Sequence, residues 1–277
     1  MELESPRSEA ARTTVPRTTD NVNAGELRRS SCTVRVIHPD DYRPKPGSFD
    51  ANGSVAPPPW HATREELELA TAFEPGALLR LVDPFLCTDG VYYVATARSV
   101  TAVFKPAAEI ESARPLVPLR SNHLREVGAY RLSRLLGFPE VPPTFAVVEK
   151  EHGPGSLRAY VSGRTVEQHR LDSAEVQELQ VFDFLIGNQD RHWENVIVST
   201  TGRLVPIDNG LSFPLRDDRD SFRLLGPQPD VPLPRTSPLR AMLLRIQPVR
   251  IAALLEQCGI EKEAIEGVLA RRRDLVQ

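Results

Sequence analysis

The stretch Phe182-Asp-Phe-Leu-Ile-Gly-Asn-Gln-Asp-Arg-His-Trp-Glu-Asn195, followed by Pro206-Ile-Asp-Asn-Gly210, is the part of the chain that decides the fold. An apolar run ends at a Gly-Asn pair and opens into a polar loop that contains Asp190 and Asn195. A further acid, Asp208, comes after the short apolar runs 196–198 and 204–207. A turn-like Ser-Thr-Thr-Gly segment separates these runs, so they predict a β-hairpin. The hairpin would bring Asn195 and Asp208 to one point.

The elements around this stretch are mostly helical. We expect a helix that begins at the N-cap residue Ser173 and runs to Ile186. Residues 214–238 are rich in proline and charge, which predicts a long loop. The apolar spacing of residues 239–255 and 261–275 predicts two closing helices.

The first half of the folded body is richer in strands. A capping box at Thr63-Arg-Glu-Glu66 predicts a first helix. A second helix is expected from Leu124 to Leu136, with Gly137 as its C-terminal stop. Five β-like runs are expected to form strands, at residues 77–82, 91–94, 100–104, 144–148 and 157–161. The sequence therefore predicts an α+β, bilobal fold at residues 61–277, with a strand-rich N-lobe (about 61–160) and a helix-rich C-lobe (about 161–277).

Residues 1–60 differ from this body. They are poor in large apolar side chains and rich in Pro, Ser, Thr and Arg, so they bury too little surface to offset their ordering entropy. We expect a disordered N-terminal extension that could bind a partner. One alternative stays open: Thr33-Val-Arg-Val-Ile37 alternates and could add a strand to the edge of a sheet.

Composition narrows the class of protein. The chain has 277 residues, 40% of them hydrophobic, which is enough for one large core or two small lobes. A net charge of −3 argues against a nucleic-acid binder. No apolar run is long enough to span a bilayer, and the first residues lack the apolar core of a signal peptide. The cysteines Cys32, Cys87 and Cys258 have no disulfide or metal-ligand spacing, so we expect reduced thiols and a cytoplasmic protein.

The polar residues of the opening stretch have the spacing of a phosphoryl-transfer site. Protein kinases place a catalytic Asp, a metal-binding Asn five positions later and a second metal-binding Asp after a short hairpin. Asp190 is the candidate catalytic carboxylate, and Asn195 and Asp208 are candidate ligands of Mg²⁺ or Mn²⁺, which prefer oxygen. Gly210 would allow a sharp turn after Asp208.

Each of these motifs alone has an ordinary explanation. A single Asp-Arg-His in a loop is more often a solvated turn than a catalytic element. We expect Arg191 and His192 to support the loop structurally, Arg191 by pairing with a carboxylate, rather than to bind metal. The weight of the prediction rests on Asp190, Asn195 and Asp208 taken together.

The first lobe should supply the groups that bind ATP phosphates. Lys105 ends a predicted strand, and Glu126 lies in the first turn of the following helix, so the two could form the strand-lysine to helix-glutamate ion pair of kinases. The ordinary alternatives are a strand-end lysine in water and an acid that favours a helix N-terminus. Gly90 is the single glycine of the candidate phosphate loop Thr88-Asp-Gly90, which is a weak motif.

Several segments in this order resemble the phosphatidylinositol 3-/4-kinase-like superfamily. They are Val103-Phe-Lys-Pro106, Leu124-Arg-Glu-Val-Gly-Ala-Tyr130, Val141-Pro-Pro-Thr144, Gly155-Ser-Leu157, Gly187-Asn-Gln-Asp-Arg-His192 with Asn195, and Ile207-Asp-Asn-Gly210. The resemblance covers roughly residues 80–215 and is nearest to the small type II and plant gamma-type phosphatidylinositol 4-kinases, some of which are protein kinases. HipA-type bacterial serine kinases and the secreted casein-kinase group are more distant relatives.

The resemblance implies a protein-kinase-like fold that uses ATP and Mg²⁺. It implies that Lys105 contacts the ATP phosphates with Glu126 as its partner. It also implies that Asp190 is the catalytic acid/base and that Asn195 and Asp208 bind metal. The order Asp190-Arg191-His192, with the acid first, is typical of this atypical branch, whereas ordinary protein kinases place His and Arg before the acid.

The acceptor hydroxyl is the open question. Residues 215–223 mix acids and arginines and do not form a clearly basic patch for an inositol phosphate headgroup, which favours a protein Ser/Thr acceptor over a phosphoinositide. A lipid kinase remains an alternative, as does a nucleotide-binding pseudokinase scaffold, because the phosphate loop has so little glycine. The same metal site could also transfer AMP or hydrolyse a phosphate ester.

Overall fold

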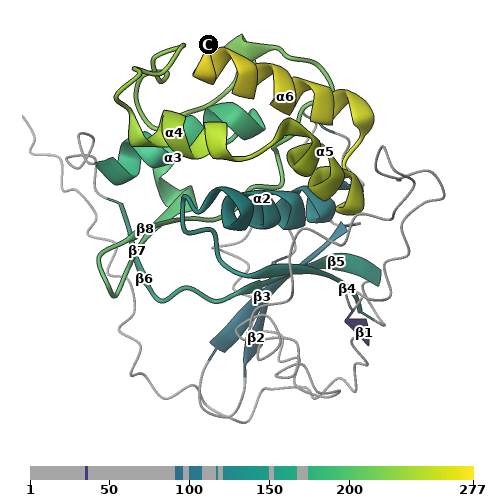
Figure 1. The fold of residues 1–277 in the computed structure, drawn as a ribbon. Helices are drawn as coiled ribbons and strands as arrows, with labels where there is room; N and C mark the ends of the chain where they lie inside the picture. The colour runs from purple at the N-terminus through teal and green to yellow at the C-terminus, as the bar shows by residue number, and fades with distance from the viewer. Residues whose placement is uncertain are drawn as a thin grey trace, which may run out of the picture.

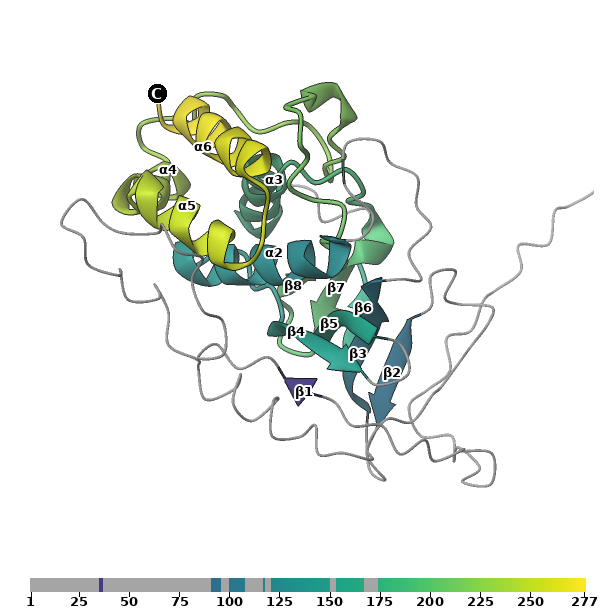
Figure 2. The same cartoon turned by 90° about the vertical axis from the view of Figure 1, so that its right-hand side faces the viewer.

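The computed structural model describes residues 35–36, 91–95, 100–107, 117, 121–149, 153–166 and 174–277. In this part of the chain a five-stranded sheet lies on one side of a central helix, and a group of helices lies on the other side (Figures 1 and 2). The helix expected after Thr63, the strand expected at residues 77–82, Gly90, Cys32 and Cys87 lie outside the described residues.

The larger sheet is antiparallel throughout and has the order β1-β4-β5-β3-β2. Its strands are β1 (Arg35–Val36), β2 (Tyr92–Ala95), β3 (Val100–Pro106), β4 (Thr144–Glu149) and β5 (Gly153–Ala159). A small apolar cluster stabilises the sheet through Tyr92, Ala102, Phe104, Phe145, Val147 and Leu157. The short β1 pairs with the edge of β4, which is the added strand that the sequence left open as an alternative.

The start of β5 was predicted wrongly. The strand begins at Gly153, four residues before the expected start. The sequence concealed this start because Gly153-Pro-Gly155 has the composition typical of a turn. A Cβ added at Gly155 would lie 2.5 Å from the backbone oxygen of Lys105 and from the ring of Phe104. Glycine in this strand therefore permits the close approach of β3 and β5.

Helix α2 (Asn122–Leu136) lies between the five-stranded sheet and helix α5 in both views (Figures 1 and 2). It is buried over most of its surface, as expected of a helix enclosed by two layers. Its predicted end is confirmed: Gly137 is left-handed, with φ 83°, and its N–H donates to the Ser133 carbonyl. This helix carries Glu126 toward the sheet.

The second half begins with α3 (Ala174–Ile186), which is nearly all buried and leads into the polar loop. The predicted hairpin is confirmed as β7 (Val196–Ser199) and β8 (Leu204–Pro206), preceded by the 3₁₀ turn Trp193–Asn195. A third strand, β6 (Gly163–Thr165), pairs with β7 and was not predicted, because three residues are too few for a detectable alternation. Ser173, the expected N-cap of α3, lies outside the described residues.

The closing helices are α4 (Pro238–Arg245), α5 (Pro248–Gln257) and α6 (Lys262–Val276). The single helix predicted at residues 239–255 is thus two helices, because Pro248 has no N–H to donate and disfavours helical backbone at the residue before it. The long loop is confirmed at residues 214–237, apart from the 3₁₀ turn Arg219–Ser221.

One large apolar core joins α2, α3 and the closing helices, with Leu132, Phe182, Leu185, Phe213, Leu243 and Leu255 fully or almost fully buried. The strand-rich first lobe and helix-rich second lobe of the predicted α+β fold are confirmed. Among the helices of the described residues, none has the length and apolar character that crossing a membrane requires.

Candidate active site

Three elements that are far apart in the sequence meet at Lys105. The ammonium Nζ of Lys105, at the end of β3, lies 3.1 Å from Glu126 Oε1 on α2. It also lies 2.7 Å from Asp208 Oδ1, in the loop after β8. The expected ion pair with Glu126 is present, and Asp208 is a second partner of Lys105 that the sequence did not indicate. Lys105 therefore connects the sheet, the central helix and the candidate metal ligand.

Lys105 and Asp208 stabilise each other in their charged forms. Burial lowers the pKa of Lys105, but the carboxylates of Asp208 and Glu126 more than offset it, so the pKa lies above its ordinary value. Burial raises the pKa of Asp208, but the positive charges of Lys105, Arg158 and Arg191 together hold it below its ordinary value. Lys105 is thus an ammonium and Asp208 a carboxylate at neutral pH.

Glu126 also holds the backbone that follows Asp208. Its second oxygen, Oε2, accepts a hydrogen bond of 3.0 Å from the N–H of Asn209. Asp208 itself adopts a left-handed backbone with φ 57°, which costs free energy for a residue with a Cβ but is tolerated best by Asn and Asp. We expected Gly210 to provide the unusual backbone conformation of a sharp turn after Asp208. Gly210 does not have a positive φ, and Asp208 itself adopts the left-handed conformation.

The buried side chain of Arg191 makes hydrogen bonds to several segments around the polar loop. Its Nε and Nη2 donate to the two oxygens of Asp183, at 2.9 and 3.1 Å. Its Nη1 donates to the carbonyl oxygens of Asn195 and Ile207, at 2.8 and 2.6 Å, and Nη2 also donates to Asn209 Oδ1 at 2.6 Å. One guanidinium thereby ties α3, the loop and the segment that carries Asp208. These contacts are those of a structural residue.

Asp183 is a residue of the candidate site that sequence reasoning missed. Its side chain is fully buried in the last turn of α3, and burial raises its pKa while Arg191 and Asn188 lower it. A charged residue within the apolar run Val181–Ile186 was the available signal, because a buried carboxylate needs a partner. Asn188 extends the network: its Nδ2 donates to Asp183 Oδ1 at 3.3 Å, and its Oδ1 accepts from the N–H of Asp190 at 2.8 Å.

The side chain of Asn195 is oriented by its own loop. Its Nδ2 donates to the Asp190 carbonyl at 3.1 Å and lies 2.9 Å from His192 Nε2. Since an amide nitrogen can only donate, His192 Nε2 is the acceptor, and both amide hydrogens are used. The oxygen Oδ1 is then the atom of Asn195 that can bind a metal. The contact with His192 thus helps to fix the orientation of the Asn195 side chain.

The side chain of Asp190 is 27% exposed, so it can reach a bound substrate. Its neighbour is Arg223, whose Nη1 lies 4.0 Å from Asp190 Oδ1. The N–H of Arg223 donates to the Asn188 carbonyl at 2.9 Å, which docks residues 221–223 on the loop.

The hairpin places the two candidate metal ligands at neighbouring positions. Val196 is opposite Pro206, and the N–H of Ile207 donates to the Asn195 carbonyl at 2.9 Å. Asn195 therefore faces the residue that precedes Asp208. The described residues contain no group of three His, Cys, Asp or Glu side chains that could enclose a metal. One amide and one carboxylate fit Mg²⁺ that takes its remaining ligands from ATP phosphates and water.

Comparison with known proteins agrees with the resemblance seen in the motifs. Residues 171–264 match the model of the family "Phosphatidylinositol 3- and 4-kinase". The chain is 29% identical over 185 residues to phosphatidylinositol 4-kinase gamma 4 of Oryza sativa subsp. japonica, in a match that covers 51% of this chain and 33% of that protein. The chain thus spans about a third of the length of this relative. The predicted similarity to phosphatidylinositol 3-/4-kinases is confirmed.

A solved structure of the golgi casein kinase is also similar in arrangement. It shares 15% identity with this chain at a TM-score of 0.48, over 78% of this chain and 74% of the other.

Proposed function

We propose that this phosphatidylinositol 3-/4-kinase-like chain is a kinase that uses ATP and Mg²⁺ to transfer the γ-phosphate to a hydroxyl acceptor. The observation that carries the proposal is the position of Lys105 between Glu126 and Asp208, at 3.1 and 2.7 Å. A lysine held by a helix glutamate is the phosphate-binding group of kinases, and an adjacent aspartate is the metal-binding group. In this account, Asp208 would hold Mg²⁺ beside the nucleotide phosphates.

Each residue then has one task. Lys105 binds the ATP phosphates and is oriented by Glu126. Asn195 and Asp208 would hold Mg²⁺, which would neutralise charge on the phosphates and orient the transferred group. Asp190 accepts the proton of the acceptor hydroxyl as the bond to phosphorus forms. Arg191 keeps Asn195, Ile207 and the residue after Asp208 in register, so that these groups act together.

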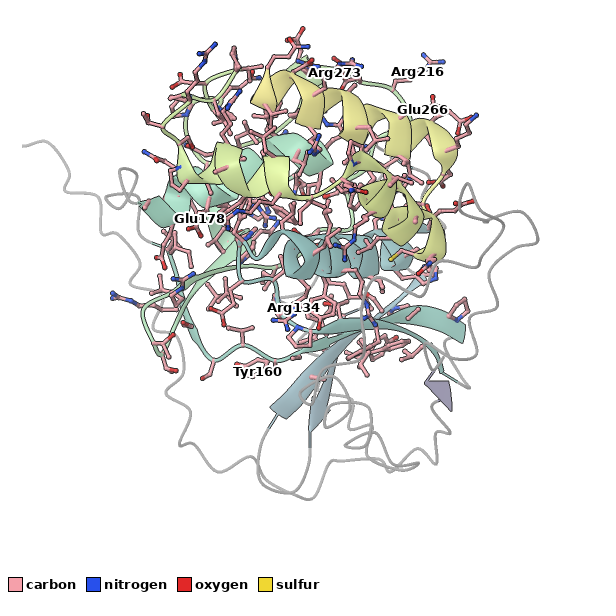
Figure 3. All side chains as sticks on the ribbon, viewed as in Figure 1. Arg134, Tyr160, Glu178, Arg216, Glu266 and Arg273 are labelled. Carbon is pink, nitrogen blue, oxygen red and sulfur yellow. The ribbon has the colours of Figure 1, made fainter. Side chains whose placement is uncertain are left out.

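Two acceptor classes have support. Within residues 215–223, Arg219 pairs with Asp217, and these two also pair with Asp274 and Arg271 of α6. Arg216 and Arg223 are exposed, and Arg216 lies at the outer surface near α6 (Figure 3). A surface of mixed sign supports a protein Ser/Thr acceptor, as the sequence favoured. The name of the rice relative supports phosphatidylinositol as the alternative acceptor.

A nucleotide-binding scaffold is the second candidate function. Its motivation is the glycine-poor segment around Gly90, because a weak phosphate loop would bind ATP without positioning it for transfer. The filled positions Lys105, Asp190, Asn195 and Asp208 support turnover instead. Binding of Mg–ATP without transfer to any acceptor would favour the scaffold.

The deciding experiment is an acceptor panel. The purified chain is incubated with γ-labelled ATP and Mg²⁺ together with phosphatidylinositol vesicles, a generic protein substrate or no addition. We expect label on at least one acceptor and loss of nearly all transfer in Asp208→Ala, with the variant still folded. Mass spectrometry of the product should show the mass of one phosphate, which separates this reaction from AMP transfer. Full turnover in Asp208→Ala would overturn the assignment.

A further inference from the structure

The carboxylate of Glu261, just before α6, reaches back to the start of α2. Its Oε2 accepts a hydrogen bond of 2.9 Å from Arg125 Nη2, and its Oε1 accepts one of 3.4 Å from Ser121 Oγ. Arg125 and Glu261 are 136 positions apart in the sequence. A single carboxylate of the C-terminal helices thus holds the first turn of α2 through both of its oxygens.

This contact places a negative charge beside the buried positive charge of Arg125. The side chain of Arg125 is 0% exposed, and that of Glu261 is 32% exposed. Burial lowers the pKa of Arg125, and the carboxylate of Glu261 acts in the opposite direction. Within the described part of the chain, Nε and Nη1 of Arg125 are buried without a hydrogen-bond partner. The Nη2 contact with Glu261 is therefore the interaction that compensates the buried guanidinium.

The residue next to Arg125 belongs to the active site. Adjacent residues on an α-helix project about 100° apart, so Arg125 and Glu126 hold α2 from two directions. Glu126 contacts Lys105 and the backbone of Asn209, on the sheet side of the helix. Any rotation of α2 that moved Arg125 away from Glu261 would also turn Glu126 away from Lys105.

Close packing surrounds the same contact. A Cβ added at Gly128 would lie 3.3 Å from side-chain atoms of both Ile260 and Phe213. Ile260 directly precedes Glu261, and Phe213 follows Asp208 by five positions in the sequence. Figures 1 and 2 show α5 lying against the face of α2 that is opposite the sheet. The position of α2 is thus set by the carboxyl-terminal helices as well as by the sheet.

We propose that Arg125 and Glu261 are a positioning pair that fixes α2 so that Glu126 stays on Lys105. The inference rests on the proposed function, in which Lys105 binds the ATP phosphates. It adds that nucleotide affinity is set from the loop between α5 and α6, which carries Glu261 and does not contact Lys105. In protein kinases the position of the corresponding helix controls whether this lysine–glutamate pair forms. Here the carboxyl-terminal helices hold α2 in the position at which the pair forms.

The first test measures Lys105 directly and needs no nucleotide. The full chain and its Glu261→Gln variant are treated with a limiting amount of an amine-acylating reagent, and peptide mapping follows the modification of each lysine over time. Glu261→Gln removes the charge and keeps the shape of the side chain. We expect faster modification of Lys105 in this variant, because Lys105 loses its contact with Glu126. Lys45 and Lys150, which lie far from Glu261 and Glu266 in the sequence, serve as the internal references.

The second test measures nucleotide affinity by calorimetry with Mg²⁺ and a non-hydrolysable ATP analogue. We expect Glu261→Gln to weaken binding by between about 2-fold and 30-fold, the range typical of residues that couple to a distant site. In a Glu126→Gln background the same change should add little, because the pair acts through Glu126. A merely structural role would give the same loss in both backgrounds.

The matched control is Glu266→Gln. Glu266 lies on α6, points outward into solvent (Figure 3) and pairs with Lys262 on the surface at 3.6 Å. It should leave both Lys105 modification and nucleotide affinity unchanged. If Glu261→Gln does not fold, Glu261→Asp, which keeps the charge and shortens the reach, should accelerate Lys105 modification. Folded Glu261 variants with unchanged Lys105 modification would overturn the proposal, and that readout is independent of whether the chain transfers phosphate.

Discussion

Replacement of Arg191 by methionine should be among the most destabilising single changes in the helix-rich lobe. Arg191 donates five hydrogen bonds of 2.6–3.1 Å, two of them to Asp183, whose side chain is 0% exposed. Methionine keeps much of the volume but leaves the Asp183 carboxylate buried and unpaired. Breaking a buried ion pair by removing one partner costs about 3–5 kcal/mol. The three oxygen acceptors on Asn195, Ile207 and Asn209 also lose their donor.

The assay is urea unfolding of the wild type and variant, with the free energy of unfolding extrapolated to water. Arg203→Met is the matched control, because Arg203 is half exposed and pairs on the surface with Glu175 at 3.1 Å. An exposed pair of this kind contributes about 0–1 kcal/mol. The double variant Arg191→Met/Asp183→Leu should lose less than the sum of its single changes, because it removes the unpaired carboxylate. A loss below about 1 kcal/mol in Arg191→Met, or strict additivity, would refute the reasoning.

Three further predictions follow from single contacts. Gly155→Ala should destabilise the chain by about 1–3 kcal/mol in thermal or urea unfolding, because its Cβ would lie 2.5 Å from the Lys105 carbonyl; an unchanged midpoint would contradict the close packing of β3 and β5. The pKa of Asp208 is lower in the folded protein than its ordinary value of about 4, so its carboxylate contributes stability at pH values above about 4. This contribution should be lost as the pH falls through the lower pKa of the folded state. Lys105→Met should flatten this pH dependence in acid unfolding curves. Asp208→Asn tolerates the left-handed backbone at φ 57° but lacks the charge, so it should keep the thermal midpoint of the free protein within a few degrees and lose the stabilisation that Mg–ATP gives the wild type; equal stabilisation of both by Mg–ATP would remove Asp208 from the metal site.

The candidate residues of the proposed site could be picked out from the sequence because their spacing is local. Asp190, Asn195 and Asp208 lie in one loop and hairpin, and the hairpin follows from the alternation of apolar residues and a turn. Helix α2 and its end at Gly137 were predictable for the same reason, because a periodic run and a left-handed glycine are local signals.

The features that the sequence did not reveal depend mainly on contacts between residues that are far apart in the sequence or are brought together by the loop. Asp183 could be recognised only as a charge within an apolar run, and its partner Arg191 follows from the geometry of the loop. The contact between Arg125 and Glu261 spans 136 positions and leaves no local pattern. The break between α4 and α5 had a local signal in Pro248, but the apolar spacing on both sides concealed it.

The central claim, that this chain transfers phosphate through Asp190, is tested most directly by one comparison. Labelled γ-phosphate transfer to the best acceptor of the panel is measured for the wild type and for Asp190→Asn, after equal thermal midpoints show that both are folded. Loss of a positioned proton acceptor should slow transfer by about 10²–10⁴-fold, with the affinity for Mg–ATP retained. Transfer by Asp190→Asn at the wild-type rate would contradict the account.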